Sequence, residues 1–169
     1  IIEPQPADLD LTVEHLRTHA YSGVNVTGPY KVEVMKPCTV LDDTAQRSGA
    51  VNTLVFGKNG ATSGLNTDVA GFCMNVKEAA PDFDYARAPV LVIGAGGAAR
   101  AIVYGLLLLG AKEIRISNRT REHADAIARH FPQVKVHDWE NRETATDGCC
   151  VIVNTTSVGL HGEDPFDLL

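Results

Sequence analysis

A glycine-rich segment behind an apolar run carries the clearest chemical signal in the sequence. Gly94, Gly96 and Ala99 form a Gly-x-Gly-x-x-Ala pattern directly after the apolar run 90–93. In a dinucleotide-binding loop the first glycine permits a tight turn, and the second lets a pyrophosphate approach the backbone. The small third residue allows the following helix to pack closely on the strand, and that helix presents N–H groups to the phosphates. The pattern therefore predicts a dinucleotide site.

The next expected strand, residues 113–117, indicates which dinucleotide binds. An NAD site usually ends this strand with Asp or Glu, whose carboxylate accepts hydrogen bonds from the ribose 2′-hydroxyl. Here Asn118, Arg119 and Thr120 follow, without an acid. A guanidinium can pair bidentately with a 2′-phosphate that a carboxylate would repel. The sequence therefore favours NADP, and the missing acid also counts against a methyltransferase.

The elements that must position this loop alternate between strands and helices. We expect helices from the glycine loop to about residue 109, where Gly110 ends the helix, and over 121–130. Between and after them we expect strands at 90–93, 113–117, 134–136 and 150–153. Strands that alternate with helices at this spacing are typical of α/β proteins with a parallel, doubly wound sheet.

The residues before this pattern predict a separate α/β region. A helix is expected over 11–19 and another from Thr67-Asp68 to about 79, with strands at 24–27, 51–56 and 61–64. The polar segment 81–89, bounded by prolines, fits a boundary or hinge. We therefore expect two domains, residues 1–80 and residues 81–169.

Composition excludes several classes of function. The 169 residues include 15 Lys+Arg and 21 Asp+Glu, and the net charge of −6 argues against nucleic-acid binding. No apolar run reaches the length of a membrane span, and no secretory leader is visible. We expect a cytoplasmic protein, a monomer or a homodimer, without a nucleic-acid or membrane partner. Because the chain starts at Ile1 rather than at a methionine, we expect it to be a fragment.

The cysteines and histidines give no indication of a disulfide or a metal. His15 and His19 are four residues apart on an expected helix, but no third ligand is near them in the sequence. We interpret the adjacent pair Cys149 and Cys150 as small buried residues, because a disulfide between neighbours is strained. The cysteines as a set show no CxxC spacing: Cys38, Cys73, Cys149 and Cys150.

A series of motifs, in the same order along the chain, resembles the shikimate dehydrogenase family. Residues 23–31, Gly-Val-Asn-Val-Thr-Gly-Pro-Tyr-Lys, are similar to the family signature Asn-Val-Thr-x-Pro-Tyr-Lys. The other motifs are 49–53 (Gly-Ala-Val-Asn-Thr), 64–68 (Gly-Leu-Asn-Thr-Asp), the glycine loop, 118–120 and 154–159 (Asn-Thr-Thr-Ser-Val-Gly). The resemblance implies an oxidoreductase of aromatic amino acid biosynthesis, which reduces 3-dehydroshikimate to shikimate with NADPH. It also implies that residues 1–80 bind this small-molecule substrate and that residues 81–169 form a Rossmann-type NADP-binding domain.

The resemblance assigns roles to single residues. It implies that Lys31 is the catalytic lysine, that Asp68 is its partner, and that Thr27 and Asn52 bind substrate. This agrees with the chemistry, because ketone reduction needs a proton at the oxygen, and an ammonium held beside a carboxylate can supply it. We expect Asn66 to hold the turn rather than to bind substrate. The implied cofactor residues are Asp43, Gly94, Ala95, Gly96, Gly97, Ala98, Asn118, Arg119, Thr120, Arg121, His123, Thr156 and Ser157.

His123 departs from the family, which usually has a second basic residue at this position. We therefore expect Arg119 to carry most of the contact with the 2′-phosphate, with Arg121 assisting. The family's serine-containing substrate segment and its C-terminal glutamine have no match in the chain, so the residues that bind the substrate carboxylate are expected outside it.

Two alternatives remain open. A quinate/shikimate dehydrogenase would accept an extra hydroxyl and often use NAD, which the missing acid after the second strand disfavours. A non-catalytic NADP-binding regulator would need neither Lys31 nor Asp68.

Overall fold

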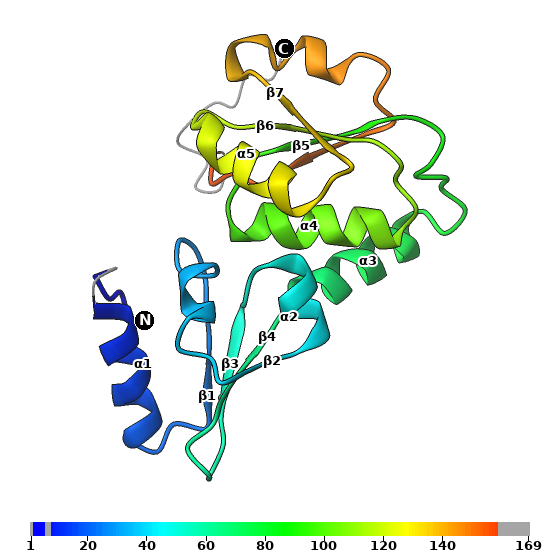
Figure 1. Ribbon diagram of the computed structural model, residues 1–169. Coiled ribbons are helices and arrows are strands. Elements are labelled where there is room, and N and C mark those ends of the chain that lie inside the picture. The colour runs from blue at the N-terminus through cyan, green and yellow to red at the C-terminus, as the bar shows by residue number, and fades with distance from the viewer. Residues whose placement is uncertain (1, 6–7, 159–169) are drawn as a thin grey trace.

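The computed structural model describes residues 2–5 and 8–158 and consists of two α/β units stacked along the long axis of the molecule (Figure 1). The first unit is a mixed sheet of four strands in the order β1-β3-β4-β2. Strand β3 is antiparallel to both β1 and β4, whereas β2 is parallel to β4. The strands are β1 (Gly23–Asn25), β2 (Val40–Leu41), β3 (Thr53–Phe56) and β4 (Thr62–Leu65).

Helix α1 (Leu9–Thr18) packs against one side of this sheet. Its apolar side chains recur at helical spacing, so they lie on one face of the helix. Leu9, Val13 and Leu16 are buried, and the first two pack in one cluster with Val51 and Leu54. A short helix, α2 (Asp43–Ser48), is capped at its N-terminus by Asp42, whose carboxylate accepts a hydrogen bond from the Ala45 N–H. The first unit therefore has its own small core.

The second unit is a fully parallel sheet in the order β7-β6-β5-β8. Its strands are β5 (Val90–Ile93), β6 (Ile114–Ser117), β7 (Val134–His137) and β8 (Val151–Asn154), with helices α4 (Gly97–Leu108) and α5 (Arg121–His130) between them. All four residues of β5 are buried, as expected for a central parallel strand. The predicted doubly wound α/β fold is confirmed.

The two faces of β5 pack against different parts of the chain. Val90 and Val92 contact the main core with Val103 and Leu106 of α4. Leu91 and Ile93 instead pack with residues of two short 3-10 helices, η3 (Trp139–Asn141) and η4 (Thr144–Thr146). The segment after β7 therefore covers the face of the sheet opposite α4.

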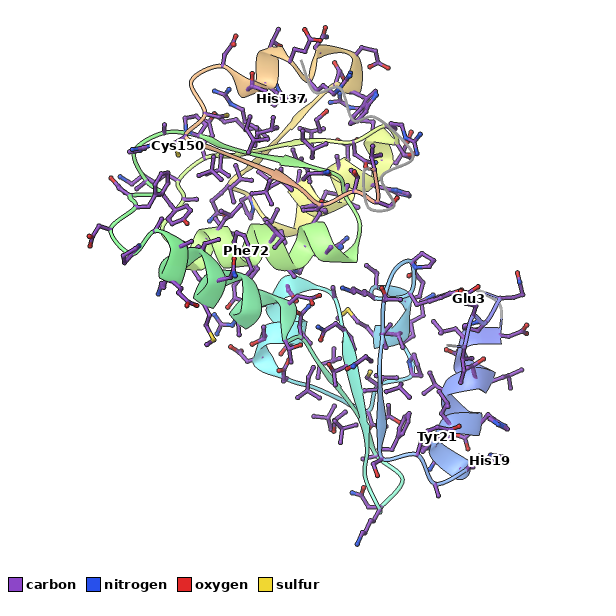
Figure 2. The ribbon with its side chains drawn as sticks, turned by 180° about the vertical axis from the view of Figure 1, so that it is seen from behind. Glu3, His19, Tyr21, Phe72, His137 and Cys150 are labelled. Carbon is purple, nitrogen blue, oxygen red and sulfur yellow. The ribbon has the colours of Figure 1, made fainter. Side chains whose placement is uncertain are left out.

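Helix α3 (Asp68–Ala79) connects the two units. It begins in the first unit, and Figure 2 shows Phe72 on its side facing α4. Phe72 and Val76 pack against the core of the second unit, and a Cβ on Gly105 of α4 would lie 2.9 Å from the Phe72 ring. The glycine thus permits close packing of the two helices. The domain boundary at residues 80/81 stays a prediction, and α3 lies on its N-terminal side.

Several expectations from the sequence need correction. The sequence predicts no helix or strand between Lys31 and Gly49, but this segment contains η2 (Glu33–Met35), β2 and α2. These elements are too short to produce a readable period, so the contacts around them decide their conformation. Cys149 and Cys150 are free thiols, but they are half-buried rather than buried as predicted. Their thiols contact backbone carbonyls: Cys149 Sγ lies 3.2 Å from that of Ala145 and Cys150 Sγ 3.4 Å from that of Ala88.

Candidate active site

Lys31 and Asp68 are brought into direct contact from different elements. Lys31 Nζ donates a hydrogen bond to Asp68 Oδ2 at 2.8 Å, and the two side chains are 14% and 31% exposed. Lys31 lies in the turns that follow β1, whereas Asp68 is the first residue of α3. Partly removed from water, the two charges compensate each other, so the pair holds a proton donor beside an acceptor. The catalytic role of the pair stays a prediction.

Asn52 orients the carboxylate of this pair. Its Nδ2 donates to Asp68 Oδ1 and to Thr67 Oγ1, both at 2.8 Å. Its Oδ1 accepts from the Thr67 N–H at 3.0 Å and from the Thr53 hydroxyl at 3.0 Å. Both oxygens of Asp68 therefore have a donor, which fixes the plane of the carboxylate.

Asn66 holds the turn that carries Asp68, as the sequence analysis expected. The residue is 3% exposed, and its Nδ2 donates to the Ala50 carbonyl at 2.8 Å and to Ser48 Oγ at 3.2 Å. Its Oδ1 accepts from the backbone N–H of Asp68 at 3.0 Å. The side chain thus ties the start of α3 to the end of α2.

The glycine loop of the second unit contacts the lysine directly. A Cβ on Gly97, the first residue of α4, would lie 2.5 Å from Lys31 Cβ and 3.1 Å from Lys31 Cδ. The aliphatic part of Lys31 therefore rests against the backbone at the start of α4. This contact places the lysine–aspartate pair beside the expected dinucleotide loop.

A second contact between the units lies at the end of α2. Gly49 has a φ of 69°, and a Cβ there would lie 3.0 Å from Arg100 Nη1 of α4. Burial lowers the pKa of the Arg100 guanidinium below its ordinary value, and the Glu33 carboxylate opposes this shift. His130 Nε2 lies 2.9 Å from the Arg47 carbonyl oxygen, so it carries the hydrogen in this bond. Contacts from the first turn of α4 and from the last residue of α5 thus join the second unit to the first.

A pocket of about 480 Å³ opens at the carboxyl end of the parallel sheet. Gly94 has a φ of 104°, and a Cβ there would lie 2.6 Å from Thr155 Oγ1, so no larger residue fits this turn. Gly96, the residue before α4, faces open space, and no side chain caps the helix. The first N–H groups of α4 can therefore bind a phosphate. These features fit a dinucleotide.

Only some of the predicted cofactor residues line this pocket. Seven of them line it: Gly94, Ala95, Gly96, Asn118, Arg119, Thr156 and Ser157. The remaining six are not among the lining residues: Asp43, Gly97, Ala98, Thr120, Arg121 and His123. Gly97 and Ala98 continue the loop into α4, where their backbone remains beside the pocket.

Charge pairing distinguishes the basic residues near the pocket. Arg121 forms ion pairs with Asp138 and with Asp125, so its charge is compensated. Within residues 2–5 and 8–158, Arg119 makes no ion pair, and it lines the pocket. His123 is exposed on the first turn of α5. Roles for Arg121 and His123 in cofactor binding stay predictions, as does the role of Asp43, which is paired with Arg47 on α2.

Thr27 lines a pocket whose lining residues do not include Lys31 or Asp68. It lines a separate groove of about 740 Å³ between α1 and β1, together with Tyr30 and apolar residues such as Val13. Its expected contact with substrate stays a prediction.

Sequence reasoning missed four residues that line this pocket: Trp139, Arg142, Thr155 and Val158. Thr155 directly precedes the predicted Thr156. Trp139 and Arg142 follow the third parallel strand, whose carboxyl end lies at the same edge of the sheet as the glycine loop. The parallel fold was the available signal, since loops after parallel strands share one edge.

His15 of α1 and His19, which follows the helix, form no metal site with neighbours that the structure describes. The His15 and His19 rings stack at 3.9 Å. Figure 2 shows His19 at the end of α1 that points away from the second unit. In residues 2–5 and 8–158, no group of three or more His, Cys, Asp or Glu side chains could hold a metal ion. Over the same residues, no helix has the length and apolar character needed to cross a membrane.

The fold and the site together define a class of protein. A domain that carries a lysine–aspartate pair is joined to a Rossmann-type domain whose nucleotide loop touches that lysine. Residues 1–54 match the family model described as "Shikimate dehydrogenase substrate binding domain". Residues 76–159 match the model "Shikimate / quinate 5-dehydrogenase". The chain belongs to the shikimate dehydrogenase family.

Individual relatives agree with this assignment. A curated shikimate dehydrogenase (NADP(+)) of Paramagnetospirillum magneticum is 42% identical over 164 residues, which cover 96% of this chain and 59% of that protein. The crystal structure of shikimate dehydrogenase from Aquifex aeolicus has a TM-score of 0.84 and 41% identity, covering 98% of this chain and 59% of that one. A quinate dehydrogenase from Corynebacterium glutamicum in complex with NAD has a TM-score of 0.83 and 28% identity, covering 96% and 58%. The chain spans less than two thirds of the length of these relatives.

We predict that Asn66→Ala destabilises the protein by about 2–4 kcal/mol, because the Ala50 carbonyl and the Asp68 N–H lose their hydrogen-bond partner. Urea unfolding of the complete protein that carries this chain measures the change. Asn59→Ala, which removes one hydrogen bond in an exposed turn, is the matched control and should cost less than about 1 kcal/mol. Equal losses in the two variants would contradict the role assigned to Asn66.

We also predict that Gly97→Ala lowers kcat by roughly 10-fold or more, because the new methyl group displaces Lys31 and small misplacements of reacting groups are costly. Gly71→Ala on α3 is the control, since a Cβ there meets no atom within 4 Å. Steady-state kinetics of both variants measure the effect. An unchanged kcat for Gly97→Ala would show that the close contact with Lys31 does not matter for turnover.

Proposed function

We propose that the protein containing this chain catalyses the reversible, NADPH-dependent reduction of 3-dehydroshikimate to shikimate. The observation that carries this proposal is the pair of Lys31 Nζ and Asp68 Oδ2, 2.8 Å apart, whose lysine rests on the first residue of the nucleotide-loop helix. A proton donor is thus held beside the expected position of a hydride donor. The curated relatives named shikimate dehydrogenase (NADP(+)) support the choice of reaction.

The residues of this chain account for the proton transfer in the reaction. A bound NADPH supplies the hydride. Lys31 Nζ holds the ketone oxygen and donates a proton to it, and in the reverse direction it accepts the proton of the hydroxyl. Asp68 keeps the ammonium in place through Oδ2, while Asn52 holds Oδ1. The pair is therefore oriented before substrate arrives, which reduces the reorganisation needed in the transition state.

The end of β6 supports NADP as the cofactor. Ser117, the last residue of this strand, is followed by Asn118 and Arg119 rather than by a carboxylate. Both of these residues line the nucleotide pocket. A guanidinium at this position attracts a 2′-phosphate, whereas the ribose hydroxyls of NAD have no acidic acceptor after the strand.

Steady-state assays of the complete protein test the proposal and its nearest alternative. Shikimate and quinate are each offered with NADP+ and with NAD+, and turnover of shikimate with NADP+ should have the highest kcat/KM. Preferred oxidation of quinate with NAD+ would instead assign the activity of the Corynebacterium glutamicum relative. Binding of NADP+ without turnover of either substrate would favour a regulator.

We predict that Lys31→Met lowers kcat by roughly 100-fold or more, the usual contribution of a positioned acid–base group. Methionine keeps the aliphatic part that rests on Gly97, so the affinity for NADP+ should change less than about twofold. Lys58→Met in an exposed turn is the control and should leave kcat unchanged. Asp68→Asn should also reduce kcat. A Lys31→Met enzyme with normal kcat would exclude Lys31 as the proton donor.

We predict that Arg119→Ala raises the KM for NADP+ by about 10-fold or more and leaves the KM for NAD+ nearly unchanged, because a charge-assisted contact with the 2′-phosphate is lost. Arg129→Ala, an exposed arginine in the last turn of α5, is the control. If the NADP+ preference of Arg119→Ala were undiminished, the phosphate contact would have to come from another residue.

A further inference from the structure

Residues 47–52 contact the second unit at their beginning and the lysine–aspartate pair at their end. They comprise the last two residues of α2, its cap Gly49 and the segment that leads into β3. Helix α2 contacts α4, and Figure 1 shows it directly beneath that helix. This short stretch of chain therefore lies between the two units.

Two nitrogen-bearing side chains of the second unit meet at the end of α2. A Cβ on Gly49 would lie 3.0 Å from Arg100 Nη1 and 3.5 Å from His130 Nε2. His130 also donates to the Arg47 carbonyl at 2.9 Å, one of the last carbonyls of α2, which have no partner within the helix. Arg100 is half-buried and brings a positive charge to this carboxyl end, where the carbonyl dipoles favour a cation. Both side chains therefore hold the end of α2 from the second unit.

The other end of the segment holds both members of the lysine–aspartate pair. The Val51 N–H donates to the Lys31 carbonyl at 2.7 Å. Asn52 Nδ2 donates to Asp68 Oδ1 at 2.8 Å. Asn66, which fixes the start of α3, is also bonded to the backbone of this segment. A displacement of residues 47–49 would therefore reach Lys31 and Asp68 through only a few residues of chain.

The contact at α2 supplements two others between the units. Helix α3 runs from one unit to the other, and Gly97 rests against the side chain of Lys31. Arg100 lies one turn after Gly97 on α4, so both face the first unit. Units joined by a small interface are free to move relative to each other unless further contacts hold them. Two contacts leave a rotation about the line that joins them, and a third contact removes it.

We propose that Arg100 and His130 are positioning residues, which hold the end of α2 and thereby set the distance between the lysine–aspartate pair and the reactive end of the bound dinucleotide. The proposal rests on the proposed function, in which Lys31 protonates the ketone that receives the hydride. Neither residue is among those that line the nucleotide pocket, so both act through the segment that they hold. Because reacting groups have to be placed to within about 1 Å, a loosened end of α2 slows the chemical step.

Single-turnover oxidation of shikimate by the complete protein tests this. The protein is in excess over NADP+ and saturated with shikimate, so the rate constant of NADPH formation does not depend on the fraction of active molecules. Arg100→Ala and His130→Ala should each lower this rate constant by roughly 5-fold or more. Calorimetric titration with NADP+ should give a Kd within about twofold of the wild type, since the nucleotide pocket is unchanged. A variant that merely misfolds in part would keep the rate constant and lose binding stoichiometry.

Conservative variants separate the hydrogen bond of His130 from its bulk. His130→Gln, whose amide can donate to the Arg47 carbonyl, should recover much of the rate constant, whereas His130→Glu, which has no donor when ionised, should not. Arg129→Ala is the control, since this side chain is the exposed neighbour of His130 on α5. The double variant of Arg100→Ala and His130→Ala should lose less than the product of the two single losses, because both residues act on one contact.

Four results would contradict parts of this scheme in different ways. Rate constants within about twofold of the wild type in both alanine variants would overturn the inference and leave the proposed function intact. A weaker affinity for NADP+ at an unchanged rate constant would also overturn it, because the residues would then act on binding. Equal losses in His130→Gln and His130→Ala would overturn the role of the His130 hydrogen bond. If the wild type formed no NADPH from shikimate, the proposed function would fail, and this inference would fail with it.

Discussion

The ion pair between Lys31 and Asp68 is the interaction on which the candidate site depends. Two charges that are partly removed from water are stable only if each has a partner and the remaining hydrogen-bonding atoms are satisfied. Lys31 and Asp68 come from different turns, so both turns have to be held in register. Asn52 does this for the carboxylate and Asn66 for the start of α3. The small sheet of the first unit therefore serves mainly to keep these four side chains in place.

The second constraint is the direction of the strands in the second unit. Because all four strands are parallel, the glycine loop, Arg119, the η3 segment and Thr155 are collected at one edge of the sheet. Helix α3 then couples this edge to the first unit, since it starts at Asp68 and packs Phe72 on α4. The close approach of Gly97 to Lys31 is the result. Lys31 and the glycine loop are neighbours because one helix packs in both units.

Much of the fold could be predicted from local patterns. The buried strand 90–93, the helix over 121–130 and the glycine loop depend on periodicity, caps and glycine conformation, which are properties of neighbouring residues. Strand β2 and helix α2 could not be predicted in this way, because two residues or six residues carry no readable period. Cys149 and Cys150 are less buried than predicted, since residue type and spacing cannot distinguish a fully buried thiol from a half-buried one.

The sequence by itself determined the chemistry available to this protein: a phosphate-binding turn, a strand without a terminal acid, and a lysine and an aspartate in motifs that resemble one family. Only the tertiary structure decided which of several equivalent cations meet the pocket. The residues after the second strand favoured Arg119 with Arg121 assisting, but no local pattern indicated that Arg142 lines the pocket and that Arg121 does not. Arg121 forms ion pairs with Asp138 and Asp125 away from the pocket lining, and Arg142 lies on the Trp139 ring at the pocket wall. Coulomb energy depends on distance in space, and the path of the chain between residues sets that distance.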